Sequence, residues 1–171
     1  MNITNFEFKA KVKSTHEYEK KLQQLNPVFK GTDNQTDTYF NVNKGRLKLR
    51  EGNIENALIN YERENIAGSK SSSVILYKHN PDKALKDILV YQFGVKTIVN
   101  KTRKIYFIEN VKFHFDEVKN LGAFIEVEAI DNNGNFSATE LREQCNKYFV
   151  FFELKQEDMI DKSYSDLLLA E

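Results

Sequence analysis

The sequence has little of several residue types, and each shortage excludes a class of protein. Its single cysteine, Cys145, cannot form a disulfide within the chain, so a reducing compartment such as the cytoplasm is expected. No apolar run is long enough to cross a bilayer, so no membrane span is expected. The opening residues 1–4 also lack the basic and apolar pattern of a secretory signal.

No segment rich in Pro, Gly or Ser divides the 171 residues, and no repeat or low-complexity stretch is present. One domain is therefore expected over residues 1–171, long enough to form a core without a disulfide or a metal. Hydrophobic residues make up 40% of the chain, which argues against intrinsic disorder.

An excess of either charge is also absent, since 25 basic and 25 acidic side chains give a net charge of zero. This removes the simplest argument for a nucleic-acid-binding protein. The balance is uneven along the chain, however. From Ser137 to the end there are four basic and eight acidic residues, so the preceding part carries a net charge of +4.

Apolar and charged side chains alternate in four segments, at residues 6–12, 46–50, 112–116 and 124–129. A period of two predicts strands with one dry face and one charged face. An antiparallel sheet with one face in water would explain any single segment. Like charges on neighbouring strands repel, so their repetition favours a concave charged face that holds a strongly anionic ligand.

The fold class expected is α+β, with an eight-stranded antiparallel closed β-barrel. The charged face would form the interior of a tunnel, and helices would cover the apolar outside. The expected strands lie at about 3–13, 35–43, 45–51, 57–65, 72–79, 96–108, 110–118 and 122–131, so that the barrel covers residues 3–131. Helices are expected at 14–25, 81–93 and 137–152, with an acidic amphipathic helix at 156–170.

Seven segments in order carry a resemblance to a known family. They are Asn5 to Lys11, Gln35 to Phe40, Gly45 to Glu51, Leu58 to Arg63, Lys101 to Arg103, Phe115 to Val118, and Leu121 to Glu128. With these segments the chain resembles the CYTH superfamily, or triphosphate tunnel metalloenzymes, and within it the class IV adenylate cyclase-like (CyaB-like) branch. The resemblance implies an eight-stranded tunnel that binds a small-molecule triphosphate together with Mg²⁺ or Mn²⁺.

The resemblance also implies roles for individual residues. Carboxylates expected to ligate metal are Glu7, Glu126, Glu128 and Asp116. Basic residues expected to bind the triphosphate are Lys9, Lys11, Arg46, Lys48, Arg50, Arg63, Lys78, Lys101, Arg103 and Lys112. Lys48, Arg63 and Glu128 are expected to be catalytic.

One position departs from the family's opening pattern of Glu-x-Glu-x-Lys, because Asn5 replaces the first glutamate. Its amide offers a carbonyl oxygen but no charge, so one metal site is expected to be weaker or bridged by water. Among other residues, His114 and Cys145 are expected to be structural. Asp37 and Tyr39 could either line a tunnel mouth or serve the fold.

The leading functional hypothesis is a metal-dependent triphosphatase. One alternative is a class IV adenylate cyclase that converts ATP to cyclic AMP and pyrophosphate, and another is a non-catalytic module that binds triphosphate or another polyanion. A single-stranded RNA binder ranks below these, because paired inward carboxylates would repel a nucleic-acid backbone. The resemblance further implies a homodimer.

Overall fold

The structure is a computed structural model that describes residues 2–63 and 72–170, with side chains from 5–62 and 74–170. Its strands are β1 (Asn2–Val12), β2 (Val28–Phe40), β3 (Arg46–Glu51), β4 (Ala57–Arg63), β5 (Ser72–Lys78), β6 (Val95–Ile108), β7 (Val111–Val118) and β8 (Gly122–Asp131). Its helices are α1 (His16–Gln23), α2 (Lys83–Phe93), α3 (Ala138–Phe151) and α4 (Tyr164–Leu169), with a 3₁₀ turn at Gln156–Asp158.

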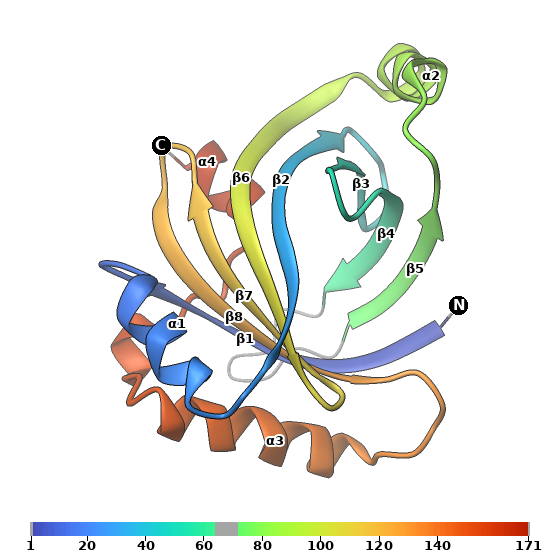
Figure 1. The fold of residues 1–171 in the computed structure, drawn as a ribbon. Coiled ribbons are helices and arrows are strands. Elements are labelled where there is room, and N and C mark those ends of the chain that lie inside the picture. Colours follow the sequence, from blue (N-terminus) through green and yellow to red (C-terminus); the bar gives the residue numbers. More distant parts are fainter. Residues whose placement is uncertain (1, 64–71, 171) are drawn as a thin grey trace.

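The eight strands form one strongly curled antiparallel sheet in the order β1-β5-β4-β3-β2-β6-β7-β8, and the hydrogen-bonded order closes into a barrel where β8 pairs with β1 (Figure 1). The two seams of β1 differ in length. It pairs with β8 from Thr4 to Val12, but with β5 only at Asn2 and Ile3. The α+β class, the eight antiparallel strands and the outer helices are therefore confirmed, while the barrel is held together beside β5 by a short contact.

Two expected elements differ from their bounds in the structure by more than two residues. β2 begins at Val28 rather than near residue 35, and its register shifts between Phe29 and Gly31. This bulge interrupts the period of two, and most side chains from 28 to 34 are exposed, so the segment has no alternating pattern to detect.

The helix expected at 156–170 is shorter than predicted. The backbone after the 3₁₀ turn bonds to β1, where the Ile160 amide donates to the Lys9 carbonyl at 2.8 Å. Ser163 then starts α4 with a capping box, in which its hydroxyl accepts from the Asp166 amide. This second start signal divides the segment into a turn and a short helix.

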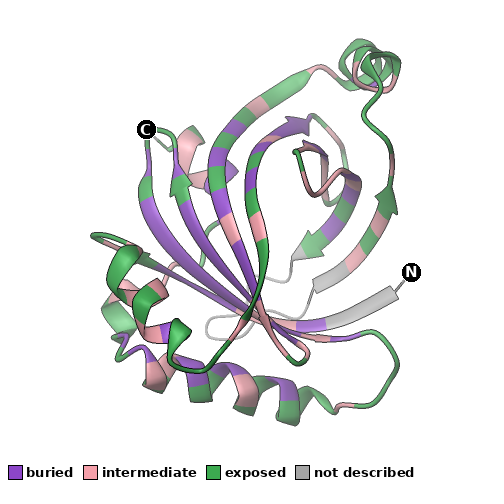
Figure 2. Cartoon of the chain, in the orientation of Figure 1, coloured by how far each residue is buried: buried purple, intermediate pink, exposed green. Residues whose placement is uncertain are grey.

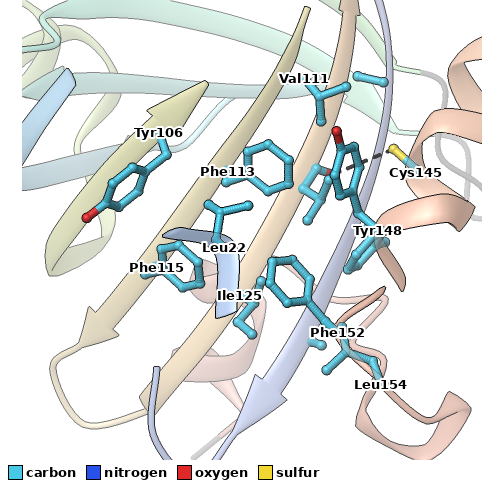
Figure 3. Close-up of a cluster of buried hydrophobic side chains, with 14 of the residues drawn as sticks. Leu22, Tyr106, Val111, Phe113, Phe115, Ile125, Cys145, Tyr148, Phe152 and Leu154 are labelled. Carbon is cyan, nitrogen blue, oxygen red and sulfur yellow. Dashed lines mark hydrogen bonds between the residues drawn. The ribbon is translucent and has the colours of Figure 1, made fainter. Parts of the chain in front are cut away.

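The main hydrophobic core lies between the outer face of the sheet and helices α1 and α3. Phe113 and Ile125 from the sheet and Cys145 of α3 are fully buried in this core (Figure 3). Val127 of β8 and Leu141 of α3 belong to the same cluster and are also fully buried. Buried residues concentrate in β7 and β8 and on one side of α3, whereas α2 is largely exposed (Figure 2). Packing of the apolar strand faces against helices thus leaves the alternate, charged faces toward the interior of the curled sheet.

A second cluster closes one part of that interior. Tyr164 of α4 is buried against Phe124 of β8, with the ring centroids 4.9 Å apart. Tyr39 of β2, Tyr61 of β4 and Val99 of β6 belong to the same cluster. In the described part of the chain, no helix has the length and apolar character needed to span a membrane.

Candidate anion and metal site inside the sheet

The strand register brings the alternating charges onto one face. Glu7 of β1 lies opposite Glu128 of β8, and Lys9 lies opposite Glu126. On the other side of β8, Lys112 of β7 is opposite Glu128. Their neighbours in sequence, such as Phe8 and Val127, belong to the core beneath α3, so the charged side chains point inward.

Asp37 of β2 is the centre of the most extensive ion-pair group. Its carboxylate accepts from Lys48 Nζ at 2.9 Å, from Lys101 Nζ at 2.9 Å, and from Arg50 through Nε at 2.8 Å and Nη2 at 2.9 Å. Burial alone would raise the pKa of Asp37, but the charges of Arg50, Lys101 and Lys48 hold it well below its usual value. Three of the predicted phosphate-binding residues therefore converge on one buried carboxylate.

Arg103 and Asp116 form a second buried pair between β6 and β7. Arg103 donates through Nε at 2.7 Å and through Nη2 at 2.6 Å, one bond to each carboxylate oxygen of Asp116. The hydroxyl of Tyr164 donates to Asp116 as well, at 2.7 Å. Asp116 was expected to contribute to metal binding. Both of its oxygens accept from Arg103, and one also accepts from Tyr164, an arrangement that orients the guanidinium. Metal binding by Asp116 stays a prediction.

Glu126 of β8 lies among three basic groups. Its carboxylate is 3.3 Å from Lys9 Nζ, 3.5 Å from Arg103 Nη2 and 2.9 Å from His114 Nδ1. Burial opposes ionisation of Glu126, but the charge of Lys9, followed by that of Arg103, lowers its pKa well below the usual range. The hydrogen bond expected for His114 is present, and its structural role stays a prediction.

The arrangement of Asn5, Glu7 and Glu128 fits a divalent cation. Burial, and then the carboxylate of Glu7, raise the pKa of Glu128 to about 7. Asn5 Nδ2 donates to Glu128 Oε1 at 2.6 Å, while Asn5 Oδ1 is buried with no hydrogen-bond partner. Two facing carboxylates beside an unpartnered carbonyl oxygen form the all-oxygen donor set that Mg²⁺ or Mn²⁺ prefers.

The site is not assembled as a full ligand cluster. Within residues 2–63 and 72–170, no group of three or more His, Cys, Asp or Glu side chains is arranged to hold a metal ion. Glu126, the third expected ligand, points toward Lys9 and His114 instead. Metal ligation by Glu126 stays a prediction.

Three of the expected phosphate-binding residues lie outside this network. Arg46 forms an ion pair with Asp166 of α4 at 2.8 Å. Lys11 is exposed near the Phe124 ring, and Lys78 is exposed at the end of β5. The side chain of Arg63 lies outside the described residues.

Three acidic or aromatic contributors were missed by the sequence analysis. Glu55, between β3 and β4, forms ion pairs with Lys112 and with Arg50. Tyr164 and Asp166 enter from α4, which was expected to carry a solvated acidic face. None of them lies on an alternating strand, so only the capping pattern Ser163-Tyr164-Ser165-Asp166 gave a signal, and it indicated a helix start rather than a site.

Comparisons with known proteins agree with this architecture. The family model of the CYTH domain matches residues 4–159. The PH1012 protein from Pyrococcus horikoshii is 25% identical with a TM-score of 0.81, and the match covers 98% of this chain and 99% of that chain. A conserved hypothetical protein from Pyrococcus furiosus is 22% identical, with a TM-score of 0.81 and coverage of 95% and 99%.

A third structure, HpAC1 from Hippeastrum, is described as having a dominant triphosphatase activity. It shares 12% identity with this chain at a TM-score of 0.70, with 99% and 96% of the two chains covered, so the likeness is one of fold. The comparison with curated proteins found no match. Since the family model spans most of the sequence, the chain belongs to the CYTH domain family.

Proposed function

We propose that this protein is a divalent-metal-dependent enzyme that binds a triphosphate along the interior of the curled sheet and hydrolyses it. The observation that carries the proposal is the convergence of cations from four strands on one interior face. These cations are Lys9, Lys48, Arg50, Lys101, Arg103 and Lys112. A triphosphate is compact and highly anionic, and Arg forks and Lys ammonium groups pair well with its oxygens.

The chain's own side chains supply positioning and charge. Arg50 and Arg103 are held in fixed orientations by their bidentate carboxylate partners, so their remaining donors are pre-oriented. Glu7 and Glu128, with Asn5 Oδ1, would hold Mg²⁺ or Mn²⁺, and the bound ion would supply charge that neutralises phosphate oxygens. Phosphoryl transfer depends mainly on these two contributions, so a covalent nucleophile is not required.

Hydrolysis is favoured over cyclisation of ATP for two reasons. HpAC1, which shares the fold, is described as a protein with dominant triphosphatase activity. In addition, the sequence has no evident site for adenine. The catalytic roles of Lys48, Arg63 and Glu128, the homodimer and the cytoplasmic location remain predictions.

Incubation with Mg²⁺ or Mn²⁺ and ATP, inorganic triphosphate or thiamine triphosphate tests the proposal. We expect release of phosphate, reduced by about 100-fold in Glu128→Gln because the carboxylate facing Glu7 is lost. The exposed Glu117 of β7 provides the control, and Glu117→Gln should retain activity. Cyclic AMP as the main product would instead identify a cyclase, and tight binding without turnover would identify a binding module.

A further inference from the structure

The connection between β3 and β4, residues 52–56, has a backbone fixed by buried polar contacts. Asp33 of β2 accepts from the backbone amides of Ile54 at 3.0 Å and Glu55 at 2.9 Å. The Gly52 amide donates to Asn56 Oδ1 at 3.0 Å. A Cβ atom on Gly52 would lie 2.5 Å from Asp33 Oδ1, so the close approach of this connection to β2 requires glycine.

This fixed connection directs one carboxylate into the interior. Glu55 Oε1 forms an ion pair with Lys112 of β7, and Oε2 accepts from Arg50 Nη1 and from Gln35 Nε2, both at 3.2 Å. β3 and β7 are not neighbours in the sheet, because β2 and β6 lie between them. The Glu55 carboxylate therefore bridges the interior, with basic partners on separate strands, as a phosphate group would.

Glu55 differs from Asp37, which also pairs with several interior cations. The Asp37 side chain is 2% exposed and attached to the central strand β2, so it is a permanent part of the site. The Glu55 side chain is 27% exposed and has one more rotatable bond. Since its backbone is held by Asp33, the side chain can leave Arg50 and Lys112 while the connection stays in place.

We propose that Glu55 is a specificity residue whose carboxylate occupies a phosphate position between Arg50 and Lys112. It thereby lowers the affinity for any anion long enough to place a phosphate group at that position. This inference rests on the proposed binding of a triphosphate but does not require turnover. A short anion uses the cations around Asp37 and Arg103, whereas a longer one reaches the position of Glu55 and must displace it.

The test is calorimetric binding of inorganic pyrophosphate and inorganic triphosphate in EDTA, where no metal-dependent turnover occurs. In Glu55→Gln we expect triphosphate to bind on the order of tenfold more tightly than in the wild type, with a clearly smaller gain for pyrophosphate. The amide oxygen of Gln can still accept from one of the two cations, Arg50 or Lys112, and the side chain keeps its size.

Two further variants test whether the gain in affinity comes from the loss of charge at Glu55 itself, rather than from a change in side-chain shape or in the overall charge of the protein. Glu55→Asp keeps the charge and should gain much less than Glu55→Gln. The control is Glu51→Gln, since Glu51 has the same 27% exposure but pairs with Lys86 of α2, and it should leave both affinities unchanged.

An unchanged or weaker triphosphate affinity in Glu55→Gln would overturn the inference, and so would equal gains for the two anions or an equal gain in Glu55→Asp. Absence of hydrolysis in the metal-dependent assay would instead count against the proposed function. Anion binding in EDTA does not depend on hydrolysis, so the two results can be told apart.

Discussion

At the scale of single residues, the interior is a set of charges that are already partnered. Asp37 is shared by Lys48, Arg50 and Lys101, and this sharing fixes three long side chains that would otherwise lose rotamer freedom on binding a ligand. Buried pairs of this kind add little net stability, but removing one partner leaves an uncompensated charge. Their main consequence is pre-organisation of the cations.

The buried side chain of His114 should make the stability of the fold depend on pH. Burial, and then the charges of Arg103 and Lys112, lower its pKa from 6.5 to about 4. Between these values the unfolded chain binds a proton that the folded protein does not. The contribution of His114 to the free energy of unfolding should therefore decrease by about 3 kcal/mol as the pH falls from 6.5 to 4. Glu128, with its raised pKa, acts in the opposite direction, so the effect of His114 is measured as the difference between a His114 variant and the wild type.

Urea denaturation in EDTA across this pH range measures the effect. His114→Gln, which retains a hydrogen-bonding partner for Glu126, should remove this contribution, so its free energy of unfolding should rise relative to that of the wild type as the pH falls from 6.5 to 4. His16→Gln, at an exposed position on α1, should leave it unchanged. Equal pH profiles for His114→Gln and the wild type would show that His114 does not control it.

At the scale of elements, the short helix α4 contacts side chains from several strands of the sheet. The ring of Tyr164 lies 4.2 Å from Lys9 Nζ and packs on Phe124, while its hydroxyl bonds to Asp116. Asp166 holds Arg46 on the far side of the interior. The helix therefore joins strands that do not pair with each other, and covers the apolar part of the inner face.

Replacement of Tyr164 tests this role of α4. Tyr164→Ala should lower the free energy of unfolding by about 3 kcal/mol, because it removes a buried ring and leaves Asp116 with one fewer donor. The control, Leu169→Ala, truncates a side chain of the same helix that is 51% exposed, and should cost far less. Similar losses in chemical denaturation for the two variants would indicate that α4 is not anchored by Tyr164.

At the scale of the whole molecule, the sequence predicted what depends on local periodicity. Alternation in strands such as β3 and β7 placed Lys48 and Lys112 on the inner face, and the register confirms it. The inward position of Glu55 could not be predicted, because it depends on a long-range contact. The Asp33 carboxylate of β2 accepts from the backbone amide of Glu55 in the connection between β3 and β4. Tyr164 is a similar case. The sequence pattern of its short helix does not indicate which strands the helix packs against, because those strands are distant in sequence.

The charge balance of the interior leads to the last prediction. Each of the main interior cations has a carboxylate partner, the pairs being Lys9 with Glu126, Arg103 with Asp116, Lys112 with Glu55, and Lys48, Arg50 and Lys101 with Asp37. A triphosphate that enters alone therefore adds uncompensated negative charge near Glu7 and Glu128. A divalent cation that enters with it offsets this charge, so the two should bind cooperatively.

Thermal unfolding with a non-hydrolysable triphosphate analogue, Mg²⁺, or both measures this coupling. We expect the melting temperature with both ligands to rise by more than the sum of the two separate shifts, because each ligand stabilises the folded protein that binds the other. Glu128→Gln should remove the excess and leave a shift with the analogue alone. Additive shifts in the wild-type protein would mean that the interior cations suffice for the anion, and that the Glu7–Glu128 pair does not link metal to triphosphate.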